Sequence, residues 1–314
     1  MGSKNPVRYG IAVLMALALA GGAGGAAQSA DQKLVLQARS RIASSRLSGR
    51  YLEVSRRVEW NARETAVIIC DMWDRHWCPS ASARVAELAP AINHFITAAR
   101  LRGVLIVHAP SQTMAFYQDY PQRQAARNAP RAANLPAGMA RGKAFISRRE
   151  LLDLWADDLN HACDCARCRQ HRTWSRQIET IQIAPEDLIS DSGAEMWNVF
   201  AERGIKNVLL VGVHTNICVV GRSFGLRNWA NFGFNAMLVR DLTDAMYSPR
   251  RASDLDHFSG TERVIVHIEK FICPTVFSTA LTGEPPFRFQ ADPRPQPKAG
   301  AAISPAQEGG SVHP

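Results

Sequence analysis

Two residues of this chain combine a reactive side chain with a position that favours catalysis, and the first is Cys218. It closely follows the apolar run 207–213 (NVLLVGV) and opens a segment with helical character. The free N–H groups and partial positive charge of a helix N-terminus lower the pKa of a thiol and can bind an oxyanion. The position favours a nucleophile, with a buried structural cysteine as the alternative.

The second residue is Asp71, which directly follows the apolar run 65–70 (TAVIIC). A carboxylate at the end of a buried strand costs free energy unless it is paired or takes part in chemistry. Beside a thiol it could accept the thiol proton and later donate that proton to a leaving amine. We therefore predict a Cys218–Asp71 catalytic pair, with a loop or helix cap as the alternative role of the aspartate.

The elements that must position this pair follow an alternating pattern. Apolar, β-branched runs predict buried strands at 65–70, 104–108, 207–213 and 235–239, with shorter or weaker strands at 51–60, 188–190 and 263–268. Helical patterns are predicted at 81–100 with a break or kink at Pro90, at 194–203, and at 219–229. Such alternation predicts an α/β three-layer sandwich with a mainly parallel, doubly wound sheet, whose active site lies at the carboxyl ends of the strands.

Two segments make the prediction more specific. TAVIICDMWDRHWC (65–78) and the stretch 207–245 around GVHTNICV resemble the signature regions of the isochorismatase-like cysteine hydrolases, over about residues 60–275. This superfamily includes nicotinamidases, N-carbamoylsarcosine amidases and ureide hydrolases. The resemblance implies catalytic roles for Asp71 and Cys218, a cis peptide at Val213–His214 that shapes an oxyanion hole, and a supporting role for Asn216.

The resemblance also implies the reaction. True isochorismatases cleave a vinyl ether and lack the nucleophilic cysteine, so Cys218 favours hydrolysis of a C–N bond. The expected function is an exported cysteine hydrolase that cleaves a small amide or ureide through a thioester, without a required cofactor. The sequence does not specify the substrate. Candidates for the pocket wall are Trp73, His76, His108 and Trp197.

One member of the family triad, a lysine, has no obvious counterpart here. Its expected place, before the helix at 194–203, is occupied by Ser190 or Asp191. A cation from the long loop could replace it, with Lys143, Arg148 and Arg176 as candidates. Losing one oxyanion-stabilising contribution costs about 2.7–4 kcal/mol in comparable sites. The alternative is therefore a catalytically weak or inactive binding protein with the isochorismatase fold.

A second cluster of reactive residues lies within the irregular stretch 111–180. It contains His161, Cys163, Cys165, Cys168 and His171. Cys165-x2-Cys168 resembles half of a zinc knuckle, and zinc could bind to Cys163, Cys165, Cys168 and His171. The same cysteines could instead form a disulfide, from Cys163 or Cys165 to Cys168 or to Cys78, or remain free thiols.

The residue pattern at the N-terminus indicates an exported protein. Lys4 and Arg8 precede the apolar stretch 11–20, which is too short for a membrane span, and small residues follow up to residue 30. We therefore expect a signal peptide at 1–30, a periplasmic or secreted protein, and no stable membrane insertion after the signal is removed, with an uncleaved N-terminal anchor as the alternative.

The 314 residues then divide into an N-terminal extension at 31–60, a hydrolase domain at 61–282 with a Cys/His-containing insertion near 111–180, and a disordered Pro-rich tail at 283–314. The basic residues behind the net charge of +9 are scattered along the chain, so we expect no nucleic-acid partner, and the family resemblance implies a small-molecule substrate. Relatives in the family are often oligomers, so a homo-oligomer is also considered.

Overall fold

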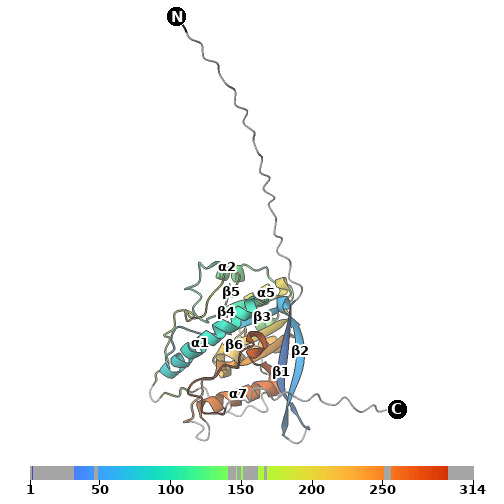
Figure 1. The fold of residues 1–314 in the computed structure, drawn as a ribbon, viewed down its shortest axis with the longest axis vertical. Coiled ribbons are helices and arrows are strands. Elements are labelled where there is room, and N and C mark those ends of the chain that lie inside the picture. The colour runs from blue at the N-terminus through green and yellow to red at the C-terminus, as the bar shows by residue number, and fades with distance from the viewer. Residues whose placement is uncertain are drawn as a thin grey trace, which may run out of the picture. The chain divides into compact units, whose positions relative to one another are not determined.

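A computed structural model describes residues 2, 32–45, 49–140, 146, 150, 162–165, 168–250 and 256–295 (Figure 1). The described residues from 32 onwards belong to one compact unit. Apart from Gly2, the predicted signal segment lies outside the described residues, as do Lys143, Arg148, His161 and the chain beyond 295. None of the helices in the described ranges has the length and apolar character that a membrane span needs.

One sheet of eight described strands organises the fold. Its order is β2-β1-β8-β7-β6-β3-β4-β5. The strands are β1 (Lys33–Ala43), β2 (Tyr51–Asn61), β3 (Thr65–Cys70), β4 (Leu105–Ala109), β5 (Leu188–Ile189), β6 (Asn207–Val213), β7 (Asn235–Asp244) and β8 (Thr275–Val276). The strands from β8 to β5 are parallel, and the antiparallel β1–β2 hairpin joins the β8 edge.

Helices cover both faces of this sheet. They are α1 (Pro79–Arg100), α2 (Pro121–Arg127), α3 (Ala137–Ala140), α5 (Gly193–Arg203), α6 (Leu226–Asn231), α7 (His257–Phe271) and α8 (Thr279–Thr282). Ile68 of β3 packs with side chains of α5 and α6, whereas its neighbours Val67 and Ile69 pack with α1 on the other face. This alternation produces two cores, and the predicted three-layer sandwich with a mainly parallel sheet is confirmed.

The prediction of a strand at 263–268 is wrong, because this apolar run belongs to the helix α7. Val264, Ile265 and Ile268 are buried at helical spacing. The helix begins after Asp256, whose Oδ1 accepts hydrogen bonds from the backbone N–H groups of Phe258 and Ser259 at 2.8 and 3.0 Å. A short apolar run is compatible with a strand or a helix, and here the N-cap at Asp256 favours the helix.

The predicted break at Pro90 is also absent, because α1 continues through it. Pro90 lies on the exposed side of the helix. There, water can satisfy the carbonyl group that loses its helical partner.

Both ends of the predicted hydrolase domain differ from the structure. Residues 33–61 are not an extension, since Leu34 and Leu36 of β1 are buried in the core. At the other end, residues 283–295 pack on the domain and do not form a tail. Phe289 is buried, and the N–H of Phe287 donates to Asp241 Oδ2 at 3.0 Å.

Candidate active site

Two neighbouring parallel strands bring the site together at one edge of the sheet. In the β3–β6 ladder Cys70 pairs with Gly212, so Asp71, which follows β3, lies beside Val213, the last residue of β6. Gly212 has a φ of +102°, and a Cβ there would lie 2.1 Å from the carbonyl oxygen of Cys70. Only glycine allows this approach of the two backbones. Asp71 itself has a φ of +47°, a conformation that aspartate tolerates better than most residues.

The segment after β6 places Cys218. The Val213–His214 peptide is cis, as the family resemblance implied. Residues Thr215–Val219 form a π-helical turn, η2, and α6 begins only at Leu226, so the predicted continuous helix 219–229 is interrupted. Asn216 fixes this turn, because its side chain donates to the Met246 carbonyl at 3.0 Å and accepts from the Met246 N–H at 2.9 Å.

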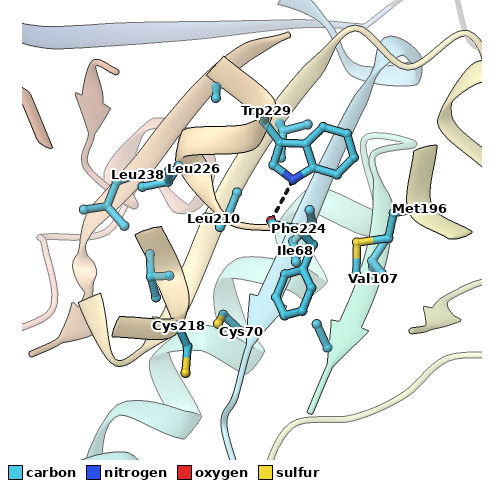
Figure 2. Close-up of a cluster of buried hydrophobic side chains, with 14 of the residues drawn as sticks. Ile68, Cys70, Val107, Met196, Leu210, Cys218, Phe224, Leu226, Trp229 and Leu238 are labelled. Atoms are coloured by element: carbon cyan, nitrogen blue, oxygen red, sulfur yellow. Dashed lines mark hydrogen bonds between the residues drawn. The ribbon is translucent and has the colours of Figure 1, made fainter. Parts of the chain in front are cut away.

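Cys218 is buried, with 6% of its surface exposed. Figure 2 shows its sulfur near that of Cys70, at one end of an apolar cluster that includes Phe224 and Trp229. The predicted nucleophile therefore lies at the boundary between the apolar core and the polar edge of the sheet.

Asp71 lies against Cys218 and is fully buried. Its Oδ1 accepts a hydrogen bond from the backbone N–H of Ser111 at 2.7 Å, and the carboxyl group lies close enough to the Cys218 thiol for each to shift the pKa of the other. The structure thus brings together the two residues that the sequence paired.

Burial changes the acidity of both groups. It raises the pKa of the Asp71 carboxyl, although Arg222 and the hydrogen bonds oppose the rise. Burial, reinforced by the Asp71 charge, also raises the pKa of the Cys218 thiol well above its usual range. This differs from the sequence-based expectation of a lowered thiol pKa, since the loss of water outweighs the helix-terminus effect. At rest Cys218 is therefore a protonated thiol beside the Asp71 carboxyl group.

Arg222 supplies the cation that the sequence appeared to lack. Its Nε and Nη2 both lie 3.5 Å from Asp71 Oδ2. Burial alone would lower the pKa of Arg222, but the neighbouring Cys218 and Asp71 raise it, so the guanidinium stays charged. The backbone N–H of Arg222 donates to the Cys218 carbonyl at 3.0 Å. That helical spacing of four residues was the available signal, and the sequence reasoning missed it.

The predicted candidates for this third position lie elsewhere. Ser190 Oγ donates to Glu195 Oε2 at 2.5 Å, and Arg176 forms an ion pair with Glu179. Asp191 Oδ2 accepts from the backbone N–H of Gln112 at 2.9 Å. The remaining candidates, Lys143 and Arg148, lie outside the described residues.

Two of the four predicted wall residues lie beside the site in an aromatic stack. Trp73 stacks on Trp174 at 4.3 Å between ring centroids, and His76 meets His214 edge to face at 5.0 Å. Burial lowers the pKa of His76 to about 4 and that of His214 to about 3. Both rings are therefore neutral near pH 7, and the buried Nε2 of His214 has no hydrogen-bond partner among the described residues.

The other two predicted wall residues belong to the interior. His108 lies between Gln177 Oε1 and Asp187 Oδ2, each 3.0 Å from one ring nitrogen. Trp197 packs on Trp229, with 6.2 Å between ring centroids. We predicted a pocket residue at His108 because it lies at the end of an apolar run. Its side chain instead points into the protein, where both ring nitrogens have hydrogen-bond partners.

Another hollow lies away from this site. A cavity of about 750 Å³ separates the β1–β2 hairpin from the end of α7, with Tyr51, Glu269 and Phe271 in its wall. It contains none of the residues that surround Cys218.

The cysteines of the insertion lie beside the site in an arrangement that differs from the predicted one. Cys163, Cys165 and Cys168 gather with Cys78, and their sulfur atoms lie within 4.8 Å of one another. His171 is exposed, and its Nδ1 lies 2.7 Å from the Arg169 carbonyl oxygen. Of the four residues predicted as possible zinc ligands, His171 therefore lies apart from the group of cysteines, and Cys78 takes part in it.

No family model matches the chain, and no curated protein matches it. Several solved structures resemble it. The first is a cysteine hydrolase from Pseudomonas syringae pv. phaseolicola, at 15% identity and TM-score 0.43 over 71% of this chain and 93% of that one. An isochorismatase family protein from Desulfovibrio vulgaris matches at 16% identity and TM-score 0.40, over 70% and 97%. N-carbamoylsarcosine amidase from Thermoplasma acidophilum matches at 14% identity and TM-score 0.35, over 68% and 96%.

The solved structures that this chain resembles include isochorismatase-family proteins and a cysteine hydrolase. At this level of similarity the chemistry has to be argued from the residues of the site.

Proposed function

We propose that this protein is a cysteine hydrolase that cleaves a C–N bond of a small amide or ureide through a thioester on Cys218. The observation that carries the proposal is the arrangement of the buried Cys218 and Asp71 with the half-buried Arg222 at the carboxyl ends of the strands. It combines a nucleophile, a base and a fixed positive charge, which are the three components of covalent acyl transfer.

The first half-reaction forms the thioester. As the Cys218 sulfur attacks the carbonyl carbon, the thiol proton passes to the Asp71 carboxylate, so the thiol need not ionise beforehand. The new C–S bond leaves a negative charge on the carbonyl oxygen, which Arg222 and backbone N–H groups near His214 and Cys218 stabilise. Asp71 then donates the proton to the leaving nitrogen, the C–N bond breaks, and an amine or ammonia departs.

The second half-reaction consumes water. Asp71 accepts a proton from the attacking water, a tetrahedral intermediate forms, and the C–S bond breaks to release a carboxylic or carbamic acid. The same proton returns to the Cys218 sulfur, which restores the resting pair. The raised pKa of Asp71 suits this double role, because a carboxyl group that titrates closer to neutrality both accepts and donates protons effectively.

The rival proposal, a binding protein without activity, rested on the missing lysine. Arg222 weakens that argument, since it places a charge within 3.5 Å of the Asp71 carboxylate. The chemistry also favours an acyl substrate over a vinyl ether, because a thiol nucleophile forms a thioester only at a carbonyl carbon.

A substrate screen with matched cysteine variants tests this function. The full chain is assayed against amides, carbamoyl compounds and ureides, and intact-mass spectrometry is used to look for an acyl group on the protein. Cys218→Ala should abolish turnover and the mass adduct without unfolding the protein. Cys273→Ala, which removes another buried thiol, should retain both. Turnover by Cys218→Ala at the wild-type rate would refute the mechanism.

We also propose that the protein is exported to the periplasm or beyond. Support comes from residues 1–30, where Lys4 and Arg8 precede a short apolar stretch and small residues. Mass spectrometry of the protein from a periplasmic fraction should show a new N-terminus near residues 27–30. An intact N-terminus in the cytoplasmic fraction would contradict export.

A further inference from the structure

Four cysteine side chains converge beside the candidate active site, from two distant parts of the chain. Cys78 is fully buried and precedes the first turn of α1, whereas Cys163, Cys165 and Cys168 belong to the insertion. The Sγ of Cys163 lies 2.9 Å from that of Cys78 and 3.1 Å from that of Cys168. The Sγ of Cys78 lies 3.4 Å from that of Cys165. We call this set the four-cysteine cluster.

The connections within the cluster differ from those of two disulfides. A disulfide joins each sulfur to one partner, but here Cys163 contacts two sulfurs and so does Cys78. All four sulfurs lie within 4.8 Å of one another. Zinc in a tetrahedral thiolate site has Zn–S distances of about 2.3 Å, which places the sulfurs about 3.8 Å apart. The sulfur–sulfur distances in the cluster begin at 2.9 Å and do not exceed 4.8 Å, so they lie on both sides of that value.

The surroundings of the cluster suit bound thiolates. The backbone N–H of Cys165 donates to Cys163 Sγ at 3.3 Å, and Ser80 Oγ lies 2.9 Å from Cys165 Sγ. The Asp164 carboxylate lies 3.6 Å from Cys78 Sγ, and its charge is offset by Arg84, whose Nη1 donates to Asp164 Oδ2 at 2.8 Å. An N–H donor to metal-bound sulfur orients the ligand, and Arg84 neutralises a carboxylate that would otherwise add to the negative charge of four thiolates.

We infer that the four-cysteine cluster binds one Zn²⁺ and thereby fastens the insertion to the start of α1. Binding releases the thiol protons to solvent and leaves four thiolate ligands on the metal. Because four protein ligands fill a tetrahedral site, no position remains for water or substrate, and the site is structural. The inference is independent of the proposed hydrolase function.

The cluster also lies next to the catalytic turn. Ile217, the neighbour of Cys218, packs against the cluster together with Met246, whose backbone holds Asn216. Arg84 extends the connection, since its Nε donates to Asp244 Oδ2 at 2.7 Å at the end of β7. Zinc would therefore fix the insertion against the segments that position the nucleophile.

Metal analysis of the full chain tests this inference directly. Protein purified under reducing conditions and incubated with ZnCl2, then freed of excess metal, should contain about one zinc per chain. Cys165→Ser/Cys168→Ser should lose at least nine-tenths of that zinc. The matched control, Cys273→Ser, changes a buried cysteine outside the cluster and should retain it.

Two further measurements keep the test valid if the double variant does not fold. Wild-type protein loaded with Co²⁺ should show the intense visible bands and thiolate charge-transfer absorption of tetrahedral cobalt. Mass spectrometry after alkylation should find the four cluster thiols protected, and a chelator should expose them.

Other results would overturn the inference. Absence of zinc from the reduced, zinc-incubated protein would do so, as would full zinc content in the folded double variant. Disulfides mapped within the cluster in protein that was never reduced, together with no Co²⁺ spectrum after reduction, would assign the thiols to cross-links. If the zinc-loaded wild-type protein hydrolyses none of the screened substrates, that result contradicts the proposed function but not the zinc site.

Discussion

Arg222 Nη2 lies 3.5 Å from Asp71 Oδ2, although 151 residues separate the two in the chain. The contact gives the buried carboxylate a positive neighbour and places that charge beside the thiol of Cys218. A guanidinium in this position can hold the carboxylate in its ionised form and stabilise the negative charge that forms during attack on a carbonyl.

Removing this charge should slow the reaction strongly. We expect Arg222→Met, which keeps much of the side-chain length, to lower kcat/KM by about 10²–10³-fold, the range seen when one oxyanion-stabilising group is lost. Arg222→Lys should lose less, because it keeps the charge. Steady-state kinetics on the best substrate measures both, with the exposed Arg203→Met as control. Activity of Arg222→Met within about threefold of wild type would remove Arg222 from the mechanism.

The pH dependence of the reaction should report Asp71. The base is the ionised carboxylate, so kcat/KM should fall as the pH decreases through the pKa of Asp71, which burial raises above the ordinary value of 3.8. His76, whose pKa is lowered to about 4 by burial, is the neighbouring group that could imitate this limb. His76→Asn should therefore keep the acidic limb, whereas residual activity of Asp71→Asn should lack it. If the acidic limb of the pH profile disappears in His76→Asn, the titrating group is the imidazole of His76 and not Asp71.

Buried parallel strands were the most predictable part of this fold. The runs 65–70 and 207–213 match β3 and β6 residue for residue, because both faces of a central strand are apolar and the signal is continuous. That result alone placed Asp71 and Cys218 at the same edge of the sheet. The strand predicted at 263–268 was wrong, because an apolar run of this length fits a strand or a helix. The Asp256 cap that favours the helix lies outside the run.

The contacts that complete the site could not be predicted with the same reliability. Arg222 lies one helical turn beyond Cys218, but its approach to Asp71 depends on how η2 leaves β6. Cys78 meets Cys163 across 85 positions, and no spacing rule connects a single cysteine to a distant group of three. Both relationships are tertiary, so local patterns do not contain them.

The close approach of β3 and β6 can be tested at Gly212. Gly212→Ala places a Cβ 2.1 Å from the Cys70 carbonyl oxygen at a φ of +102°. Gly233 provides a matched control, because it has a φ of +90° but nothing within 4 Å of an added Cβ. We expect Gly233→Ala to cost about 1–3 kcal/mol of unfolding free energy from backbone strain alone. Gly212→Ala should cost clearly more or prevent folding, as measured by urea unfolding. Equal losses in the two variants would show that the strands can separate at little cost.

The last prediction concerns Asn216, which links the catalytic turn to the segment after β7. Its side chain makes two buried hydrogen bonds with the Met246 backbone, at 3.0 and 2.9 Å. Asn216→Ala leaves the Met246 N–H and C=O without these partners, and each buried group deprived of its partner costs about 1–3 kcal/mol. We expect thermal or urea unfolding to show a loss of about 2–6 kcal/mol and kcat to fall as well, because η2 is no longer held beside Asp71. The exposed Asn128→Ala should change neither quantity. A loss of stability with unchanged kcat would mean that Asn216 supports the fold without positioning Cys218, since the turn would then keep its geometry by other contacts.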